Sequence, residues 1–406
     1  MSEAPALKRS LSLTQVTLYG IGTTVGAGIY ALIGELAGQA GAYMPLSFLI
    51  AAVLVAFSAL SFAELTARYP QAAGEATYVR AAFNSGALAR LIGLMVVAAG
   101  LVSSATIVNS FVGYLGSFIA LPTWLAIVAL VGLLTALCIW GIGQSVTVAG
   151  LFTLVEVGGL LLVIGAGSDS LAAFPQRWRE FVPPAETAVW SGILAGSFLA
   201  FYAFIGFEDM VNVAEEVRQV ERTLPLAIVL TLIATVLLYV SVAVIAVLTV
   251  PPAELQASNA PLALLFERSG GSAPLLSGIA VLAVVNGALV QMIMASRVLY
   301  GLARQNLLPE PLGRVHAATQ TPVNATLLTG TAILVAALAF DLVPLARATS
   351  YLTLTVFATV NLALLRIKLQ TRGTPAPLVY PFWVPLIGFV VSAAFLFAEL
   401  VRAITA

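Results

Sequence analysis

The sequence predicts an all-α polytopic membrane protein, and two observations carry this prediction. Hydrophobic residues make up 60% of the 406 residues and charged residues 9%, with a mean hydropathy of +1.03, far from the composition of soluble domains. The apolar residues are gathered in runs of roughly 20, the length that a helix needs to cross the hydrocarbon core. We therefore expect a bundle of membrane-spanning helices.

Eleven such runs predict eleven spanning helices, with limits near 12–38, 44–68, 88–119, 124–140, 145–167, 189–213, 224–249, 274–304, 323–341, 345–369 and 382–404. With the N-terminus in the cytoplasm, thirteen of the 18 lysines and arginines fall on the cytoplasmic side. This is the usual positive-inside bias. We therefore expect a multi-pass protein of the cell (plasma or inner) membrane with a cytoplasmic N-terminus, and eleven helices would put the C-terminus outside.

The first run contains a stretch, GIGTTVGAGIYAL (20–32), that is unusually rich in glycine for a spanning helix. Each glycine costs about 1 kcal/mol relative to alanine inside a helix, and unwound backbone at membrane depth is tolerated only where it lines a cavity. One alternative is close helix packing through Gly22 and Gly26. Another is a dinucleotide-binding loop, which would need a preceding strand. The sequence favours an unwound binding segment from Thr23 to Gly28.

The sixth run carries a second interruption, in FLAFYAFIGFEDMVNVAEEV (198–217). It places Gly206, Glu208 and Asp209 within a spanning helix, where a charged group costs about 3 kcal/mol on insertion scales. Helices one and six are five apart, and repeats of an odd number of helices must be inverted relative to each other. Broken helices in corresponding positions indicate a secondary transporter. We expect two inverted five-helix repeats and an extra eleventh helix, with limits 12–167, 189–369 and 382–404.

The two interruptions predict the chemistry of the solute. The outer half of helix one starts near Gly28 with free N–H groups, which favour an anion. The outer half of helix six ends near Phe204 with free carbonyl groups, which favour a cation. A solute with a carboxylate and an ammonium group on adjacent atoms satisfies both ends, and an α-amino acid is such a solute.

Both interrupted stretches resemble the first- and sixth-helix motifs of the amino acid–polyamine–organocation family of permeases. Three more stretches are similar to this family: SFAELTARYPQAAGEATYVRAAF (61–83), SRVLYGLARQNLLPEPLGRVHAATQTPVNA (296–325) and YPFWVP (380–385). They match the loops after helices two and eight and the start of helix eleven. The resemblance covers nearly the whole chain and is nearest to the cationic-amino-acid-transporter-like members. It implies the five-plus-five inverted repeat of the LeuT fold, which carries amino acids by alternating access.

The resemblance also implies roles for single residues. The amides of Gly26, Ala27 and Gly28 would take the substrate carboxylate, and the carbonyl groups of Thr24, Tyr202 and Ile205 would take the ammonium group. Tyr202 or Phe204 would act as an aromatic gate, and Glu208 lies where many members carry an acid linked to proton response. The substrate site that we expect comprises Thr23, Thr24, Gly26, Ala27, Gly28, Tyr202, Phe204, Ile205 and Gly206.

Helix five departs from the family pattern. Many cationic-amino-acid-like members have a lysine there, whereas TLVEVGGLL (153–161) puts Glu156 at that place. An ionised carboxylate in the middle of a span is costly, so Glu156 is a candidate for carrying a coupling proton, or for coordinating sodium directly. The alternative is a purely structural role, in which a neutral Glu156 carboxyl group is bonded to a backbone carbonyl and contributes only to packing.

We expect the other charged residues near the ends of the helices to have structural roles. We expect Glu64, Glu215, Glu216, Arg218 and Arg222 to be interface or solvated charges at the cytoplasmic ends of helices, with a gate role as the alternative. We expect Asp209 to be hydrogen-bonded to the break. The segment 69–87, between helices two and three, is expected to hold a short interfacial helix.

The composition excludes several classes of function. The sequence has a single histidine, His316, and a single cysteine, Cys138, too few for a metal triad or a reactive group of side chains. We therefore expect neither an enzyme nor a metal or other cofactor. The zero net charge argues against nucleic acid, and no filter pattern indicates a channel. We expect proton-coupled uptake or exchange of neutral amino acids, because a cationic specialist needs extra acids in its pocket and only Glu156 and Glu208 are candidates. The alternatives are a polyamine or cationic amino acid antiporter and a sodium-coupled symporter.

Overall fold

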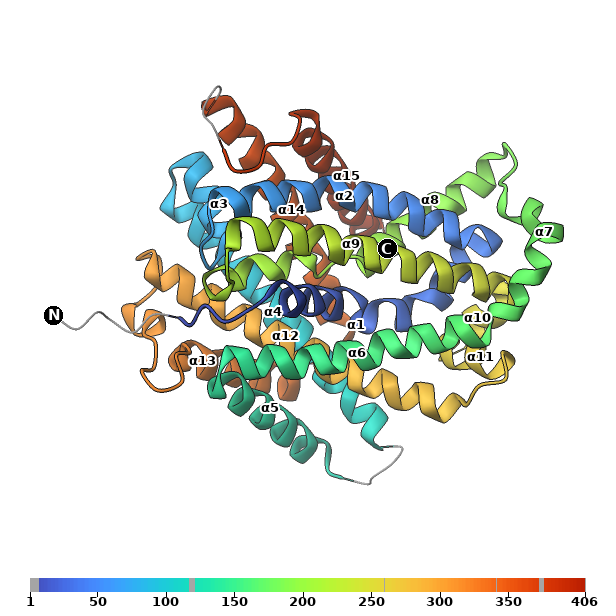
Figure 1. The fold of residues 1–406 in the computed structure, drawn as a ribbon, viewed down its shortest axis with the longest axis horizontal. Helices are drawn as coiled ribbons and strands as arrows, with labels where there is room; N and C mark the ends of the chain where they lie inside the picture. The colour runs from blue at the N-terminus through green and yellow to red at the C-terminus, as the bar shows by residue number, and fades with distance from the viewer. Residues whose placement is uncertain (1–6, 117–120, 259, 341, 372–375, 406) are drawn as a thin grey trace.

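The computed structural model describes residues 7–116, 121–258, 260–340, 342–371 and 376–405. These residues form helices and one isolated bridge between Leu11 and Val217. The long helices run side by side along the longest axis of the molecule (Figure 1). The prediction of an all-α polytopic membrane protein is confirmed.

In the part of the chain that the structure describes, eleven helices of 17 or more residues correspond to the predicted runs. They are α1 (Leu13–Ala40), α2 (Met44–Arg68), α4 (Gly86–Gly116), α5 (Thr123–Trp140), α6 (Ile142–Ala166), α8 (Thr187–Ala203), α9 (Val220–Thr249), α12 (Ala273–Arg304), α13 (Val323–Ala339), α14 (Leu342–Gln370) and α15 (Trp383–Thr405). Among the described residues, eight stretches are long and apolar enough to cross a membrane, and Val323–Ala339 and Trp383–Ala398 are shorter apolar helices. The number of eleven crossings therefore stays a prediction.

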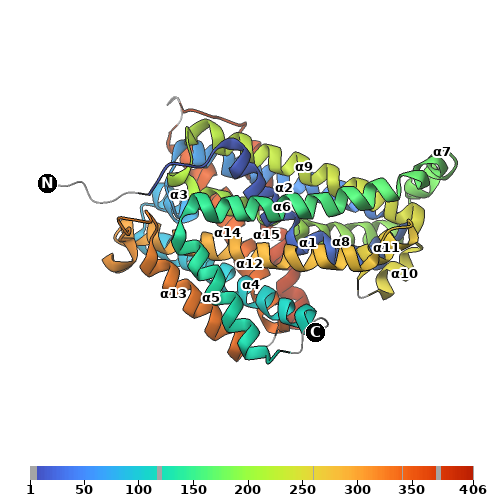
Figure 2. The same cartoon turned by 60° about the horizontal axis from the view of Figure 1, so that its bottom comes forward.

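Shorter helices connect the long ones. They are η1 (Gly41–Tyr43), α3 (Gly74–Phe83), η2 (Ser168–Ala173), α7 (Phe174–Arg177), η3 (Trp178–Phe181), η4 (Phe207–Glu216), α10 (Pro252–Ala257), α11 (Pro261–Arg268) and η5 (Glu310–Gly313). The elements α7, α10 and α11 lie at the end of the bundle opposite the N-terminus, and α3 lies at the N-terminal end (Figures 1 and 2). The connections thus form two caps on a bundle of long helices.

The outer surface of the bundle is apolar, as expected for a protein surrounded by lipid. The side chains of Leu133 and Leu237 are each 65% exposed and that of Phe397 is 70% exposed. Polar groups instead collect inside the bundle, where hydrogen bonds between helices satisfy them. Asn361 of α14, for example, donates to the Ser58 hydroxyl of α2 at 2.9 Å.

Helix α1 runs through the middle of the bundle and packs against α6, α8, α9 and α12. It begins at a capping box, in which the Ser12 side chain accepts from the backbone of Gln15 and the Gln15 side chain accepts from the backbone of Ser12. This arrangement satisfies two of the N–H groups that a helix start leaves free. The glycine-rich stretch is therefore surrounded by other helices and shielded from lipid.

The expected short helix between the second and third spans is present as α3. Its buried face includes Gly74, Glu75, Thr77 and Tyr78, and it packs against α4, α14 and η4. The helix therefore inserts between other elements and does not simply lie on a surface. This insertion brings an acidic residue, Glu75, into the interior.

Candidate functional site

Helix α1 is interrupted at Gly26, whose dihedral angles (φ 9°, ψ −133°) are not helical. The turn before the break is held by its own side chains. The Thr23 hydroxyl donates to the carbonyl oxygen of Tyr19 at 2.7 Å, and the Thr24 hydroxyl donates to that of Gly20 at 2.8 Å. A Cβ atom added to Gly26 would meet nothing within 4 Å. The break predicted from the glycines is confirmed, and it faces open space.

The second break separates α8 from η4. Helix α8 ends at Ala203, and the chain turns at Gly206, which has a φ of +127°, a conformation that glycine adopts without steric cost. A Cβ atom on Gly206 would lie 2.7 Å from the carbonyl oxygen of Thr23. The two breaks are therefore in direct contact, and Gly206 is required both for its conformation and for its size.

A cavity of about 370 Å³ lies at the two breaks, within the range of roughly 300–1,000 Å³ that is typical of small-molecule sites. Of the residues expected at the site, the following line it: Thr23, Thr24, Gly26, Gly28, Tyr202, Ile205, Gly206 and Glu208. Helices α4, α12 and α14 complete the wall. They contribute apolar side chains, among them Val96, Ala99, Ile107, Met294, Val356 and Phe357, and polar ones, among them Ser103, Gln291 and Thr353.

Two of the expected residues, Phe204 and Glu156, lie outside the lining, and the side chain of a third, Ala27, is not placed. Phe204 is fully buried outside the lining, and its ring packs against Phe48 and Tyr239 with centroid distances of 6.3 and 5.2 Å. Of the two candidate gate residues, Tyr202 is thus the one that lines the cavity. Ala27 lies between two lining glycines, and its side chain is outside the described part of the chain. Glu156 is also outside the lining.

Two further acids that sequence reasoning did not assign to the pocket, Glu75 and Asp209, line the cavity together with Glu208. All three are buried, with residue exposures of 1%, 4% and 7% for Glu75, Asp209 and Glu208. Asp209 accepts from the Gln291 side chain at 2.7 Å, and Glu208 accepts from the Gly206 N–H at 2.7 Å. One part of the cavity wall is therefore acidic.

Glu75 is held in place by η4. The side chain of Asn212 accepts from the Gly74 N–H at 3.1 Å and donates to Oε1 of Glu75 at 3.2 Å. The other oxygen, Oε2, is buried without a hydrogen-bond partner. Burial raises the pKa of Glu75 to about 8, and the nearby Glu208 carboxylate also raises it.

Glu156 of α6 lies where α6 and α12 meet α1. The side-chain amide of Asn286 donates to Oε1 of Glu156 at 2.8 Å and to the Thr153 hydroxyl at 3.1 Å. A Cβ atom on Gly22 would collide with Thr153 and Asn286, so glycine there lets α1 approach this group closely. Glu156 Oε2 and Asn286 Oδ1 are buried acceptors without a partner. These two oxygen atoms can therefore accept a proton or a small cation.

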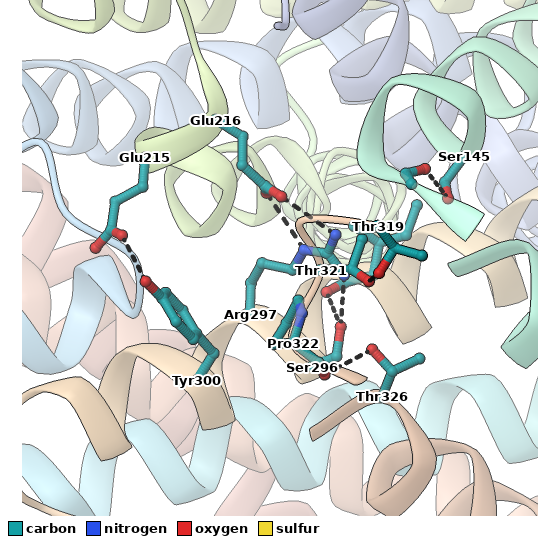
Figure 3. Close-up of polar contacts among 12 residues, drawn as sticks. Ser145, Glu215, Glu216, Ser296, Arg297, Tyr300, Thr319, Thr321, Pro322 and Thr326 are labelled. Atoms are coloured by element: carbon teal, nitrogen blue, oxygen red, sulfur yellow. Dashed lines mark hydrogen bonds and ion pairs between the residues drawn. The ribbon is translucent and has the colours of Figure 1, made fainter. Parts of the chain in front are cut away.

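Buried polar contacts surround the end of η4 (Figure 3). The guanidinium group of Arg297 donates to both carboxylate oxygens of Glu216 at 3.2 Å, and both residues are fully buried. The backbone carbonyl of Glu216 accepts from the N–H groups of Ser10 and Leu11. The segment before α1, the end of η4 and α12 are thereby joined.

The expectation that Glu64, Glu215 and Glu216 are interface or solvated charges is therefore wrong for Glu64 and Glu216. Glu216 is paired inside the protein with Arg297, which lies 81 residues away. Glu64 is fully buried and pairs with Arg68 and Lys368, both at 2.6 Å. Burial of the pairs follows because each carboxylate finds a counter-charge on a neighbouring turn or helix.

Comparison with known proteins finds a family model and several relatives that match most of this chain. The amino acid permease family model matches residues 11–403. The cationic amino acid transporter 3, mitochondrial, of Arabidopsis thaliana is 31% identical over 395 residues, which cover 92% of this chain and 64% of that protein. The branched-chain amino acid permease BcaP of Bacillus subtilis (strain 168) is 28% identical over 400 residues, covering 91% of this chain and 83% of that protein.

A third relative is the cationic amino acid transporter 4, vacuolar, of Arabidopsis thaliana. It is 32% identical over 387 residues, covering 89% of this chain and 64% of that protein. The chain thus spans somewhat less than two thirds of the length of the two plant relatives.

Proposed function

Because the chain belongs to the amino acid permease family, we propose that it is a secondary active transporter that moves amino acids across the cell membrane by alternating access. The observation that carries this proposal is the contact of the two breaks, Gly26 in α1 and Gly206 after α8, beside one cavity. Broken helices place unpaired backbone groups at a buried site, which binds a charged solute without charged side chains.

The substrate carboxylate would bind the amides that follow the break in α1, at Gly26, Ala27 and Gly28, because a helix N-terminus attracts anions. The α-ammonium group would bind carbonyl oxygens at the other side, of Thr24, Tyr202 and Ile205. The open space around Gly26 supports this placement, since the carboxylate must approach the backbone itself. Tyr202 would close over the bound solute.

Alternating access would proceed by movement of the predicted repeats, 12–167 and 189–369, relative to each other. The buried contacts of Glu216 with Arg297 and with the segment before α1 join α12, η4 and the start of the chain, and in this proposal they close the N-terminal end. With the N-terminus in the cytoplasm, as the distribution of Lys and Arg predicts, this state is closed toward the cytoplasm. Opening would then require these contacts to separate.

We propose that protons drive uptake and that Glu156 is the residue that carries them, with Glu208 responding to pH beside the cavity. The free acceptor oxygen of Glu156 and its hydrogen bond with Asn286 support this role, because a protonated carboxyl group donates where a carboxylate can only accept. The same pair of free acceptors, Glu156 Oε2 and Asn286 Oδ1, also suits a sodium ion, which prefers oxygen ligands. Sodium coupling is therefore the second candidate.

The apolar part of the wall, contributed by Val96, Ala99, Ile107, Met294 and Phe357, would hold the substrate side chain. It suits a neutral aliphatic side chain, and equally the methylene stem of a longer cationic one. The names of the relatives, cationic amino acid transporters and a branched-chain permease, include both kinds of substrate.

The test is uptake of labelled amino acids into proteoliposomes that contain the purified chain, with a proton gradient, a sodium gradient or internal substrate as the driving condition. We expect saturable uptake of at least one amino acid, stimulated by an inward proton gradient. Stimulation of uptake by a sodium gradient alone would identify sodium, and not the proton, as the coupling ion. Absence of uptake and of exchange for every amino acid would refute the proposed function.

A further inference from the structure

We propose that Glu75 is a second proton site of the transporter, which takes up a proton on Oε2 from the cavity and releases it to the cytoplasm when the N-terminal end of the bundle opens. The proposal rests on the proposed function, since the proton crosses only if the chain transports by alternating access. It adds a proton to the one that Glu156 would carry, at a place in the chain that lies outside the spanning helices.

The first argument is that Glu75 is a buried acid without a basic partner. It belongs to none of the ion pairs found in the described part of the chain, whereas the equally buried Glu64 and Glu216 are each paired with a basic side chain. A buried carboxyl group that lacks a counter-charge becomes neutral by binding a proton. Burial accordingly raises the pKa of Glu75 to about 8, so the group is largely protonated at neutral pH.

The second argument is that hydrogen bonds determine which oxygen of Glu75 takes the proton. The side-chain oxygen of Asn212 accepts from the Gly74 N–H at 3.1 Å, and a backbone N–H can only donate. The amide nitrogen of Asn212 therefore faces Oε1 of Glu75, to which it donates at 3.2 Å. An oxygen that accepts from this donor has no room for a hydrogen of its own on that side. The proton is therefore carried by Oε2, which is buried without a partner among the described residues.

The third argument comes from the side chains of α3 and of two helices that pack against it, α4 and α14. In the described part of the chain, these helices carry three exposed arginines, Arg80, Arg90 and Arg366. Lys368 of α14 is paired with Glu64. Tyr78, on the buried face of α3, stays neutral because burial raises the pKa of its hydroxyl group. Among the described residues, Glu75 thus has no counter-charge that would favour its ionised form.

The acids of η4, which also packs against α3, favour a proton on Glu75 as well. Glu208 and Asp209 line the same cavity, and a negative charge on either of them disfavours a second carboxylate nearby. The other two acids of this segment, Glu215 and Glu216, accept from donors of their own. Protonation of Glu75 therefore lowers the repulsion within the acidic part of the cavity wall.

The same segment links Glu75 to the contacts that would separate on opening. Asn212, which holds Glu75, and Glu216, which is paired with Arg297, both belong to η4. Movement of η4 away from α12 would therefore also withdraw Asn212 from Glu75. Helix α3 lies at the N-terminal end of the bundle (Figures 1 and 2), which the distribution of Lys and Arg predicts to be cytoplasmic. Water that enters there would reach Glu75.

The proton is conserved through the cycle. While the cavity is open to the outside, water in the cavity delivers a proton, and an O–H bond forms at Oε2 of Glu75. When the N-terminal end opens, hydration removes the cause that raises the pKa of Glu75. The O–H bond then breaks, and the proton leaves to cytoplasmic water. Each cycle thus moves one proton through Glu75 in the direction of uptake, because a carboxyl group holds a single proton.

The experiment counts the protons that enter proteoliposomes with each labelled amino acid, using a pH-sensitive dye enclosed in the vesicles. In Glu75→Gln, glutamine keeps an acceptor for Asn212 and cannot bind a proton, so uptake should continue with about one proton fewer per amino acid than in the wild-type chain. Glu75→Asp should keep the wild-type ratio. The matched control is Glu35→Gln, which alters an exposed acid of α1 and should also leave the ratio unchanged.

A second measurement does not depend on the folding of Glu75→Gln. Infrared spectra of the purified wild-type chain should show the carbonyl stretching band of a protonated carboxyl group that disappears as the pH rises through about 8. Glu75→Asp should shift this band, because the band then belongs to an aspartate. A band that is identical in the two proteins would assign the protonated group to another residue and overturn the proposal.

The outcomes separate this proposal from the proposed function. A folded Glu75→Gln variant with the wild-type ratio of protons to amino acid would overturn the second proton site and leave amino acid transport standing. Uptake by the wild-type chain without any movement of protons would do the same. Absence of uptake and of exchange for every amino acid would count against the proposed function itself.

Discussion

The hydroxyl group of Tyr239 lies 2.8 Å from the carbonyl oxygen of Thr24. The same hydroxyl lies 2.9 Å from the carbonyl oxygen of Ala203, so one side chain of α9 contacts the last turns before both breaks. A hydroxyl has one proton to donate, and a carbonyl oxygen has two lone pairs. Tyr239 therefore ties α1 to α8, and the Thr24 carbonyl keeps acceptor capacity for the substrate ammonium group.

Replacing Tyr239 by phenylalanine should loosen both breaks. We expect Tyr239→Phe to lower the free energy of unfolding by about 1 kcal/mol, the typical value of one hydrogen bond, and to raise the KM for substrate several-fold. Thermal unfolding of the purified protein and uptake kinetics measure the two effects. The control is Tyr19→Phe, which removes a longer contact of 3.4 Å with the Val290 carbonyl. Equal effects of the two substitutions would contradict the role of Tyr239.

The two glycines at the breaks should respond differently to alanine. Gly26→Ala places a methyl group in open space, so we expect it to fold normally and to lose most substrate binding. Gly206→Ala forces a Cβ atom against the Thr23 carbonyl and strains a φ of +127°, so it should lower the midpoint of thermal unfolding by several degrees. Circular dichroism and binding of labelled substrate distinguish the two. Normal binding by Gly26→Ala would argue against backbone recognition of the carboxylate.

Replacing Glu156 by a neutral residue should abolish the coupling of uptake to protons and leave movement of the substrate itself intact. We expect Glu156→Gln to lose proton-driven accumulation and to keep exchange of internal for external substrate, because glutamine preserves the shape of the group and cannot release a proton. Uptake into proteoliposomes with and without a pH gradient measures both. Glu35→Gln is again the control, since Glu35 is exposed. Proton-driven accumulation that survives in Glu156→Gln would assign the residue to packing or to ion coordination.

The buried pair at the N-terminal end should be stable only when both partners are present. Glu216→Gln leaves the guanidinium group of Arg297 unpaired in the interior, and loss of one partner of a buried pair typically costs about 3–5 kcal/mol. We expect the single variant to unfold at a much lower temperature. The double variant Glu216→Gln with Arg297→Met should recover most of the loss, because no isolated charge remains.

The control for this pair is Arg314→Gln, which breaks a pair between two exposed residues, Arg314 and Glu310, and should change the unfolding temperature little. The double variant could instead lose more free energy of unfolding than the two single variants, Glu216→Gln and Arg297→Met, lose together. That result would show that the two residues are not an isolated buried charge pair. If all variants are equally stable, Glu216 and Arg297 contribute nothing to closure of this end.

Both breaks could be predicted from the sequence because glycine content and charge within an apolar run are local properties. Gly26 and Gly206 interrupt their helices as expected, and eight expected residues share one cavity. The predicted limits of the long helices are also close to those observed, since a run of apolar residues ends where polar residues begin.

The acidic wall could not be predicted in the same way. Glu75 belongs to a segment that the sequence analysis assigned to the membrane interface, and nothing local indicates that α3 inserts against η4. Asp209 was expected to bond to the break, and its backbone N–H does donate to the Gly206 carbonyl at 3.2 Å. Its side chain, however, accepts from Gln291 of α12, 82 residues away, and no local pattern indicates this contact. Asn212, which holds Glu75, lies 137 residues from it in the chain.

By itself, the sequence of this protein determined that it is helical, embedded in lipid and broken at two places, because hydropathy and helix propensity act over one or two turns. The tertiary structure alone decided which acids are neutralised and which remain available at the cavity. Glu216 is paired with Arg297 and Glu64 with Arg68 and Lys368, while Glu75, Glu208 and Asp209 line the cavity and belong to none of the ion pairs found in the part of the chain that the structure describes. The physical reason is that the energy of a buried charge depends on its neighbours within a few ångströms, and helices distant in the chain supply those neighbours.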